Sequence, residues 1–563
     1  MPAFLIFMTS HAFLSHAPAL ARPLAALALA LALAGCSKAP DTAASASTTP
    51  QNGGTLVYLE QQAHNALYPP NGGFYPNGGI LNQITDKLTY QNPKTLEIEP
   101  WIAESWSINA DATEYTFKLR PGVSFSDGTP LDADAVAANF DRFGLGDKAL
   151  KHSVSEVINN YARSEVLDPL TVKFHFKQPS PGFLQATSVI GSGLVSKATL
   201  ALSLDELGDA TRIIGSGPFV VSGEVLGKEV NLQARDKYNW GPVKLAHQGR
   251  ARLDAIKIIV TPEDGVRIGA LLSGQAGLIR QVQAYDEKRV NEGKFPLYAA
   301  STRGVNDSLA FRPDNELVAD LKVRQALLHA TNSKEIVQTL FSANYPQAKG
   351  VLAAGAAGFV DQSAELAHDA ERARALLDEA GWKLQADGIR AKDGRPLALS
   401  TYESLNYVQN REVLQLVAQQ WAKVGVKLNV LSGDLGSKTI DSLDPEKIAL
   451  LPAMVGRADP DVIKSNYYPT NRNLLLQKGG ISQKVKSFED RKLNGLFEAI
   501  AAEPNPARRL ELTGQVQRYL LEQAYVIPMF EEPQIYAGAP WLHGVDFEAV
   551  GRPSLYAAWI APH

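Results

Sequence analysis

Polar and apolar residues alternate along several short runs of this chain, and the clearest run is Glu114–Leu119. This period of two predicts a half-buried strand. Residues 120–122 end the strand with a proline and a glycine, and residues 127–130 (Asp-Gly-Thr-Pro) predict a turn. Asp132 is then well placed to cap a helix that carries Phe140 on its apolar side.

Strand-like alternation and helical spacing of apolar residues also predict elements elsewhere in the chain. Residues 55–59 are a short apolar run that predicts a strand, and residues 80–88 predict a helix. Between them, residues 68–79 are crowded with glycine, proline and asparagine and predict a loop. Apolar residues at helical spacing predict a helix over 412–424, and alternation predicts a strand over 426–430.

Capping residues and glycines mark the ends of further elements. Asn332 predicts the start of a helix, with Glu335 as the partner in a capping box. The amphipathic stretch 369–380 predicts another helix, which Gly381 ends. Glycines at both ends of residues 388–394 then predict a hairpin.

Helices alternate with strands along most of the chain, which favours an α/β fold. The chain has 563 residues, and one series of strands and helices lies on each side of about Leu309. This length exceeds what a single domain usually holds, so we expect two lobes.

Composition and motifs narrow the function classes. The chain is 45% hydrophobic and 20% charged, with a formal net charge of -4 and no basic stripe, so we expect no nucleic-acid partner. The sequence has no phosphate-binding loop, no H-E-x-x-H, no G-x-S-x-G and no cysteine pair for zinc. We therefore expect a protein that is not an enzyme, without catalytic residues, metal ligands or a cofactor.

The N-terminal segment predicts export. Residues 23–35 contain only Ala, Leu, Pro and Gly, are too few to span a bilayer comfortably, and precede Cys36, the only cysteine. The tetrapeptide Leu-Ala-Gly-Cys resembles a bacterial lipobox, which implies cleavage and lipidation at Cys36; the alternative is an ordinary secretory signal with a buried cysteine. We expect a signal peptide over residues 1–35, whether translation starts at the first methionine or at Met8. Residues 36–54 are small and polar and predict a flexible tether.

Several blocks carry a family resemblance. Residues 100–106 read P-W-I-A-E-S-W, and residues 115–131 read Y-T-F-K-L-R-P-G-V-S-F-S-D-G-T-P-L. Together with I-G-S-G-P-F at 214–219 and A-L-L-S-G at 270–274, they resemble the family 5 extracellular solute-binding proteins of ABC importers, the peptide, nickel and oligopeptide-binding group. The chain departs from the usual family pattern at Trp101, Ala112 and Gly277, the last standing where an aspartate is usual.

The resemblance implies an α/β two-lobe clamp of the periplasmic-binding-protein type (type II, cluster C), with the first lobe enlarged by an extra subdomain. The expected boundaries are lobe 1 over 55–308 with its subdomain at about 101–213, lobe 2 over 309–525, and a return to lobe 1 over 526–563. The hinge is expected near 308–311 and 525–530.

Two places near predicted strand ends are candidates for ligand contact. The first is Glu60 and Gln61 with the loop aromatic Tyr75; the alternative is that this loop only packs on a core. The second is Tyr402 and Glu403, after a strand predicted at residues 396–401; the alternative is an exposed loop.

The third candidate place is the segment 456–461, which resembles a family segment whose first aspartate pairs with the amino terminus of a peptide ligand. That register implies Asp459 as the amine partner, although Asp461 competes for the alignment. Arg457 stands near a position where the family often has tryptophan, and an arginine in a dry cleft favours a carboxylate, sulfonate or phosphate. The alternative is that Arg457 and Asp459 pair with each other in a structural turn.

These expectations describe a lipid-anchored, monomeric substrate-binding protein of the periplasm or cell envelope. It is expected to capture a small peptide-like, zwitterionic or anionic solute by hinge closure and to deliver it to an ABC permease and ATPase complex. The alternatives are a secreted hydrolase or a solute-sensing receptor on a similar clamp, and a chaperone-like binder of unfolded chains. The sequence does not identify the solute.

Overall fold

The structure is a computed structural model that describes residues 49–404, 407, 409–479 and 488–563. The expected signal peptide, Cys36 and most of the expected tether lie outside the described residues. Within those ranges, no helix has both the length and the apolar character needed to cross a membrane.

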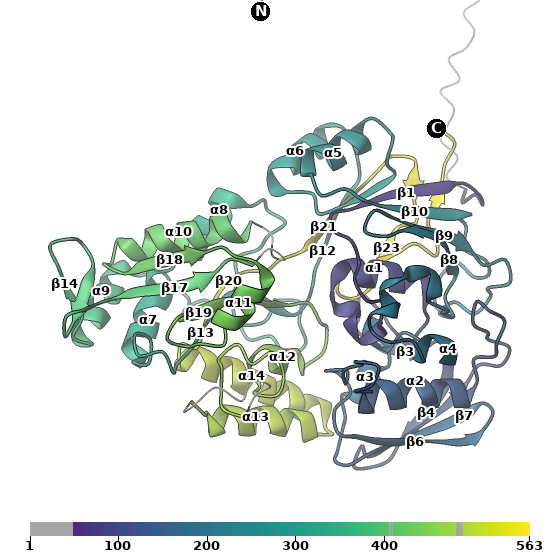
Figure 1. The fold of residues 1–563 in the computed structure, drawn as a ribbon, viewed down its shortest axis with the longest axis horizontal. Coiled ribbons are helices and arrows are strands. Elements are labelled where there is room, and N and C mark those ends of the chain that lie inside the picture. The colour runs from purple at the N-terminus through teal and green to yellow at the C-terminus, as the bar shows by residue number, and fades with distance from the viewer. Residues whose placement is uncertain (1–48, 405–406, 408, 480–487) are drawn as a thin grey trace, which may run out of the picture. The chain divides into compact units, whose positions relative to one another are not determined.

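Seven strands form the largest sheet (Figure 1). In spatial order they are β12 (Leu297–Ala300), β21 (Gln534–Gly538), β11 (Leu278–Arg280), β1 (Thr55–Glu60), β10 (Ala255–Val260), β9 (Glu229–Ala234) and β8 (Phe219–Val225). The central strand β1 runs parallel to both of its neighbours, whereas the outer pairs are antiparallel. The helices α5 (Asp264–Leu272) and α6 (Ala284–Glu292) pack near β11 and β12. The parallel centre brings the carboxyl ends of β1, β10 and β11 to one edge of the sheet.

A four-stranded antiparallel sheet carries the first aromatic core. Its order is β4 (Ala103–Ile108), β5 (Glu114–Leu119), β7 (Thr171–Phe176) and β6 (Tyr161–Asp168), and α2 (Ala133–Leu145) packs on β6 and β7. Phe117, Phe140, Phe174 and Phe183 are buried together, with ring centroids from 4.8 Å (Phe140–Phe174) to 6.3 Å (Phe117–Phe183) apart. The alternating apolar residues of β5 therefore face α2 and form a hydrophobic core.

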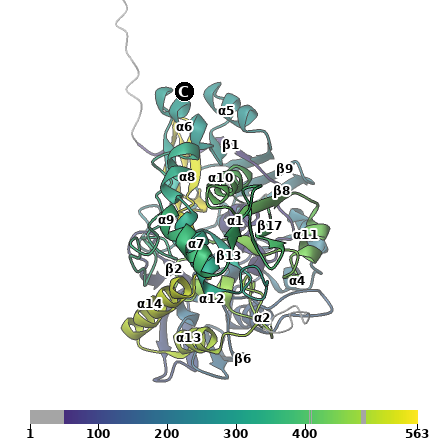
Figure 2. The same ribbon diagram turned by 90° about the vertical axis from the view of Figure 1, so that its left-hand side faces the viewer.

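A second core surrounds two smaller sheets. One consists of β19 (Leu450–Val455), β13 (Val305–Phe311) and β20 (Val526–Phe530), and the other of the parallel pair β17 (Ala398–Tyr402) and β18 (Lys427–Leu431). The helices around them are α7 (Leu321–Ala330), α8 (Ser333–Leu340), α9 (Ala370–Glu379), α10 (Asn410–Ala422), α13 (Arg491–Ala502) and α14 (Pro506–Glu522). Figure 2 shows α13 and α14 side by side, and α7 next to α9. Trp421 lies in the middle of this core and donates a hydrogen bond to Thr331 Oγ1 at 2.9 Å.

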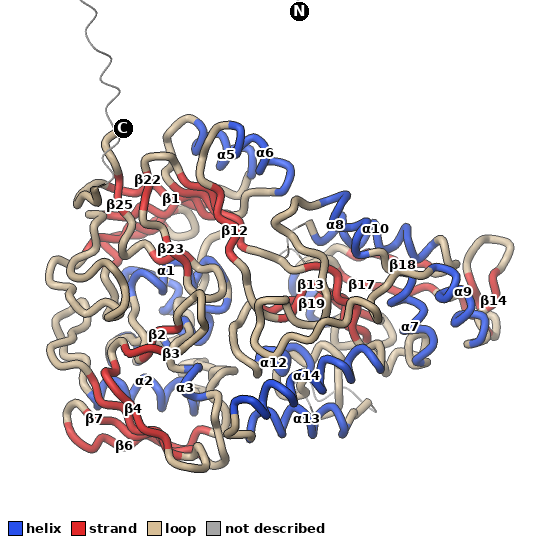
Figure 3. The backbone as a smooth tube through the Cα atoms, turned by 180° about the vertical axis from the view of Figure 1, so that it is seen from behind, coloured by secondary structure: helices blue, strands red, loops and turns tan. Residues whose placement is uncertain are grey.

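The chain passes twice between the seven-stranded and the three-stranded sheet. The consecutive strands β12 and β13 belong to different sheets (Figure 3), and so do β20 and β21 (Figure 1). β13 and β20 also pair with each other, with Leu309 opposite Ile527. Two neighbouring segments of chain therefore connect the sheets.

Short elements complete the described part of the chain. The helical ones are η1 (Pro69–Gly73), α1 (Tyr75–Ile84), α3 (Phe183–Ala186), η2 (Ile190–Ser192), α4 (Lys197–Leu200), η3 (Glu206–Gly208), η4 (Ala210–Arg212), α11 (Leu435–Asp441) and α12 (Val462–Tyr467). The strands are β2 (Thr89–Gln91), β3 (Ile98–Pro100), β14 (Lys383–Leu384), β15 (Arg390–Lys392), β16 (Arg395–Pro396), β22 (Leu542–His543), β23 (Asp546–Phe547), β24 (Pro553–Ser554) and β25 (Trp559–Ile560).

Most local predictions are confirmed. The strand Glu114–Leu119 has the predicted bounds, and Asp132 accepts a hydrogen bond from the Ala135 N–H as the cap of α2. The hairpin predicted at residues 388–394 is the β14–β15–β16 sheet. Asn332 caps α8, but its own N–H donates to Gln420 Oε1 at 2.9 Å, so the predicted capping-box role of Glu335 is wrong.

The loop predicted over residues 68–79 is also wrong in part, because α1 already begins at Tyr75. Two of its glycines, Gly72 and Gly78, are closely packed against other parts of the chain. A Cβ atom at Gly78 would lie 2.3 Å from the Arg552 guanidinium, and the neighbouring Asn77 is fully buried and bonded to Asn65 and Ala66. Tertiary contacts thus override the local propensity of this segment.

Candidate functional site

A cavity of about 410 Å³ lies where residues of both cores meet. This volume is typical of a site for a small molecule. One wall consists of the end of β1, α1 and the C-terminal strands, and the other includes residues 454–458 at the end of β19. The lining includes Gln61, Tyr75, Lys87, Trp101, Arg280, Tyr407, Arg457, Gln534, Glu548 and Arg552.

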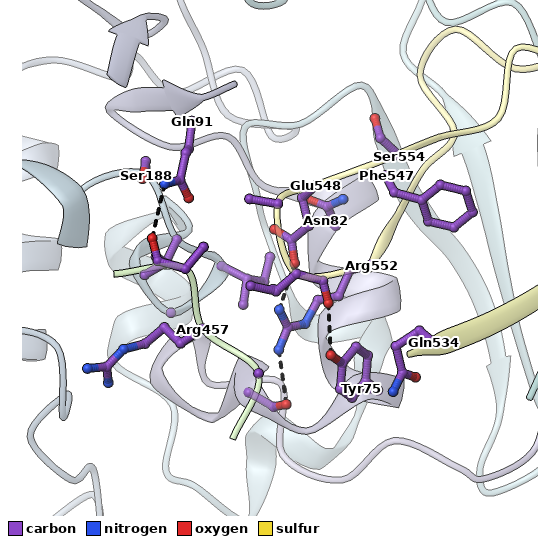
Figure 4. A pocket seen from close by; sticks show the side chains of 18 of the residues that line it. Tyr75, Asn82, Gln91, Ser188, Arg457, Gln534, Phe547, Glu548, Arg552 and Ser554 are labelled. Atoms are coloured by element: carbon purple, nitrogen blue, oxygen red, sulfur yellow. Dashed lines mark hydrogen bonds and ion pairs between the residues drawn. The ribbon is translucent and has the colours of Figure 1, made fainter. Parts of the chain in front are cut away.

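Tyr75 is held between two guanidinium groups. Those of Arg280 and Arg552 lie 5.0 and 4.7 Å from the centre of its ring, and its hydroxyl donates to the Val550 carbonyl at 2.8 Å (Figure 4). Burial raises the pKa of the Tyr75 hydroxyl to about 12, so the phenol stays neutral. The ring is therefore a fixed part of the cavity wall.

The charge of Arg280 is neutralised within the protein. Its Nη1 donates to Glu60 Oε1 at 2.6 Å, and the two side chains are 8% and 4% exposed. Arg280 also donates to Gln534 Oε1 at 2.9 Å, and the Gln61 N–H donates to Glu60 Oε1 at 2.9 Å. Glu60 thus lies behind the cavity wall, where it orients Arg280, while Gln61 lines the cavity.

Arg552 is paired in the same way. Its Nη1 donates to Glu548 at 2.7 Å and its Nη2 donates to the Gly73 carbonyl at 3.0 Å (Figure 4). This pair connects the C-terminal segment to the start of α1.

Arg457 lines the cavity and is bonded on several sides. It forms an ion pair with Asp459 and donates to Ser465 Oγ at 2.8 Å and to Glu156 Oε1 at 3.4 Å. The alternative in which Arg457 and Asp459 pair with each other therefore describes this structure. Neither Asp459 nor Asp461 lines the cavity, and Asp461 pairs with Arg509 at 2.9 Å.

Two consecutive charged residues, Asp86 and Lys87, also line the cavity. Asp86 is buried and accepts hydrogen bonds from the Tyr238 hydroxyl at 3.0 Å and from Trp240 Nε1 at 2.8 Å. Burial raises the pKa of this carboxyl to about 7. Lys87 is 4% exposed and donates to Asn82 Oδ1 at 2.5 Å.

Tyr402 and Glu403 do not line this cavity. The Tyr402 hydroxyl donates to Asp441 at 2.8 Å, and Glu403 accepts from Arg411 at 2.6 Å. Their assignment to a ligand site stays a prediction.

The structure brings Arg457 together with Gln61 and Tyr75, which lie far earlier in the chain, as candidate contacts. Lys87, Arg280 and Arg552 also line the cavity and were not predicted from the sequence. Arg280 had a usable signal, because it ends a strand that runs parallel to the one ending at Glu60. Lys87 and Arg552 had none, since Lys87 falls near the end of a predicted helix and Arg552 lies in a segment for which no element was predicted. Among the described residues, no group of three or more His, Cys, Asp or Glu side chains could hold a metal ion.

Known proteins are similar to this chain in sequence. The family described as "Bacterial extracellular solute-binding proteins, family 5 Middle" matches residues 97–470. The glutathione-binding protein GsiB of Salmonella paratyphi A is 24% identical over 486 residues, which cover 84% of this chain and 88% of the relative. The dipeptide-binding protein of Escherichia coli K12 is 26% identical over 501 residues, with the same two coverages of 84% and 88%.

Solved structures share the fold at lower identity. NikA from Brucella suis, solved in complex with Fe(III)-EDTA, has a TM-score of 0.74 at 23% identity and covers 90% of this chain and 100% of its own. A dipeptide-binding protein from Pseudoalteromonas in complex with Met-Leu has a TM-score of 0.75 at 19% identity, with coverages of 90% and 100%. The expected α/β two-lobe clamp is confirmed by these similarities. Because the family match spans more than half of the sequence, the chain belongs to family 5 of the bacterial extracellular solute-binding proteins.

Proposed function

We propose that this protein is the lipid-anchored solute-binding component of an ABC importer, and that it captures a small peptide-like, zwitterionic or anionic solute in the cavity described above. Family 5 binding proteins bind peptides or small solutes and work with an ABC permease. The observation that carries the proposal is the cavity itself, about 410 Å³ in volume and lined from both cores. One relative is named a glutathione-binding protein and the other a dipeptide-binding protein, which supports a solute of this size.

Capture would follow from closure of two lobes. The proposed lobes are 55–308, with a subdomain at about 101–213, and 309–525, and the segment 526–563 returns to the first lobe. The proposed hinge uses residues 308–311 and 525–530, which belong to the paired strands β13 and β20 next to both chain crossings. Small rotations of the backbone in these two segments would move one lobe relative to the other, and this motion would open and close the cavity.

The remaining parts of the proposal concern location and chemistry. Lipidation at Cys36 would hold a monomer at the envelope membrane, where it presents its solute to the permease and ATPase. The relatives named above are binding proteins, which supports a role without catalysis. Glu60 is proposed to orient Arg280, and Gln61, Tyr75 and Arg457 are proposed as wall residues that the solute meets.

A thermal-shift screen tests solute capture. Purified mature protein is heated with dipeptides, glutathione, amino acids, sulfonates and metal chelates in turn. A solute present at about one hundred times its dissociation constant adds about 2.7 kcal/mol to the free energy of unfolding, so binders raise the midpoint clearly. We expect short peptides or related anions to do so.

A variant that fills the cavity provides the control. Ser554 lines the cavity, and Ser554→Trp would place an indole in it, whereas Ser273→Trp changes an exposed serine at the end of α5. The solute-induced rise in midpoint should disappear in Ser554→Trp and persist in Ser273→Trp. Solute capture in this cavity is contradicted if both variants respond like the wild type.

A further inference from the structure

Lys87 is a cation in the cavity wall that forms no ion pair with any carboxylate among the described residues. Lys87 as a whole is 4% exposed, and no carboxylate oxygen among the described residues lies within ion-pair distance of its Nζ. Its hydrogen-bond partner is the neutral Asn82 Oδ1 at 2.5 Å. An ammonium group has three N–H donors, so two of them have no partner among the described residues.

The amide of Asn82 is fixed in the orientation that this contact needs. Its Nδ2 donates to the Pro553 carbonyl at 2.9 Å, which leaves Oδ1 for Lys87. Asn82 therefore positions the Lys87 ammonium without neutralising it.

The other cations that line the cavity all have carboxylate partners. These pairs are Arg280 with Glu60 at 2.6 Å, Arg552 with Glu548 at 2.7 Å, Arg472 with Glu156 at 3.9 Å, and Arg457 with Asp459. The described lining holds as many carboxylates as cations, but Lys87 is the cation among them that forms no ion pair with a described carboxylate.

A buried, unpaired ammonium is unfavourable because it loses its hydration without gaining a counter-charge. The Trp101 ring, 5.4 Å from Nζ, compensates only in part. Burial accordingly lowers the pKa of Lys87, although Glu548 and Asp86 act in the opposite direction. An anion delivered into the cavity would remove this cost, and the free energy recovered would appear as affinity.

We propose that Lys87 anchors an anionic group of the solute, a carboxylate, sulfonate or phosphate, beside the aromatic wall of Trp101. This proposal rests on the proposed function, and it moves the anion contact from Arg457, whose guanidinium is already bonded, to Lys87. Solutes that carry a free acid should bind better than the same solutes with that acid converted to an amide.

The experiment compares acid and amide forms directly. Dipeptides, glutathione and their C-terminal amides are titrated by calorimetry, together with inorganic phosphate and methanesulfonate against sodium chloride of equal ionic strength. Three proteins are used: the wild type, Lys87→Met, and Lys94→Met as a matched control at an exposed lysine outside the cavity. Met keeps the length and apolar stem of lysine and removes a buried charge, so Lys87→Met should fold.

In the wild type and in Lys94→Met we expect the acid to bind at least about thirtyfold more tightly than the amide, as is usual for a buried charge pair. In Lys87→Met this preference should disappear. The proposal is overturned if acid and amide bind equally to the wild type, if Lys87→Met keeps the preference, or if neither a simple anion nor any acid binds the wild type more tightly than chloride does.

These results separate the anchor from solute capture. Binding of amides or neutral solutes without a preference for the acid would leave the proposed function intact and remove the role of Lys87. Binding of phosphate or methanesulfonate that depends on Lys87, with no organic solute bound, would retain the anion site and count against solute capture.

Discussion

Asp86 is a buried carboxyl whose protonation changes within the range of ordinary buffers. Burial raises its pKa from 3.8 to about 7. Between these two values the folded protein holds a proton that the unfolded chain has lost, so the free energy of unfolding falls as the pH rises from about 4 to about 7. Each unit of pKa difference is worth about 1.4 kcal/mol.

Asp86→Asn should therefore flatten this part of the stability curve. Denaturant unfolding of the variant and the wild type, measured from about pH 4 to about pH 8, should differ in slope below about pH 7 and run parallel above it. Asp236→Asn, at a side chain that is 86% exposed, should keep the wild-type slope. A wild-type slope in Asp86→Asn would mean that this carboxyl is not protonated in the folded protein near neutral pH.

At the same scale, the candidate site was only partly predictable. Gln61 and Tyr75 were found because a strand end and an aromatic loop are common places for ligand contact. Arg457 was found through its unusual position in a family segment, yet its bonds to Asp459 and Ser465 depend on side-chain geometry. Lys87 was missed, because a lysine near the end of a predicted helix gives no sign that folding will bury it.

At the scale of elements, capping residues have local effects that can be measured. Asp132 accepts from the Ala135 N–H at 2.9 Å, which satisfies one of the free donors at the start of α2. Asp132→Ala should lower the free energy of unfolding by about 1 kcal/mol. Asp132→Asn, which keeps an acceptor oxygen, should lose much less. Equal losses in chemical denaturation of the two variants would contradict a capping role.

Elements with strong periodicity were predicted well, and those shaped by distant contacts were not. β5 has the predicted bounds because alternation alone determines which of its faces is buried. α1 begins five residues before the predicted helix (Tyr75 against Ile80), since Gly78 packs against Arg552, a residue far along the chain. Gly277 is similar: a Cβ atom there would lie 2.6 Å from Leu56 and Trp541, which explains why the aspartate usual in the family is missing.

At the scale of the whole molecule, the proposed closure has a direct observable. Small-angle X-ray scattering, recorded before and after saturation with a solute found in the thermal-shift screen, should show a smaller radius of gyration for the bound protein. The cavity-filling variant Ser554→Trp should show no change when the same solute is added. A raised thermal midpoint with an unchanged radius in the wild type would argue for binding without closure.

The sequence by itself determined the family, the α/β class and most of the strands and helices, because these depend on periodicity and on motifs that are contiguous in the chain. Only the tertiary structure decided which charges of the site are neutralised. Arg280 meets Glu60 through parallel pairing of β1 and β11, Arg552 meets Tyr75 across the length of the chain, and Lys87 meets no carboxylate within the described ranges. Electrostatic pairing depends on distances in space, which a linear pattern does not contain.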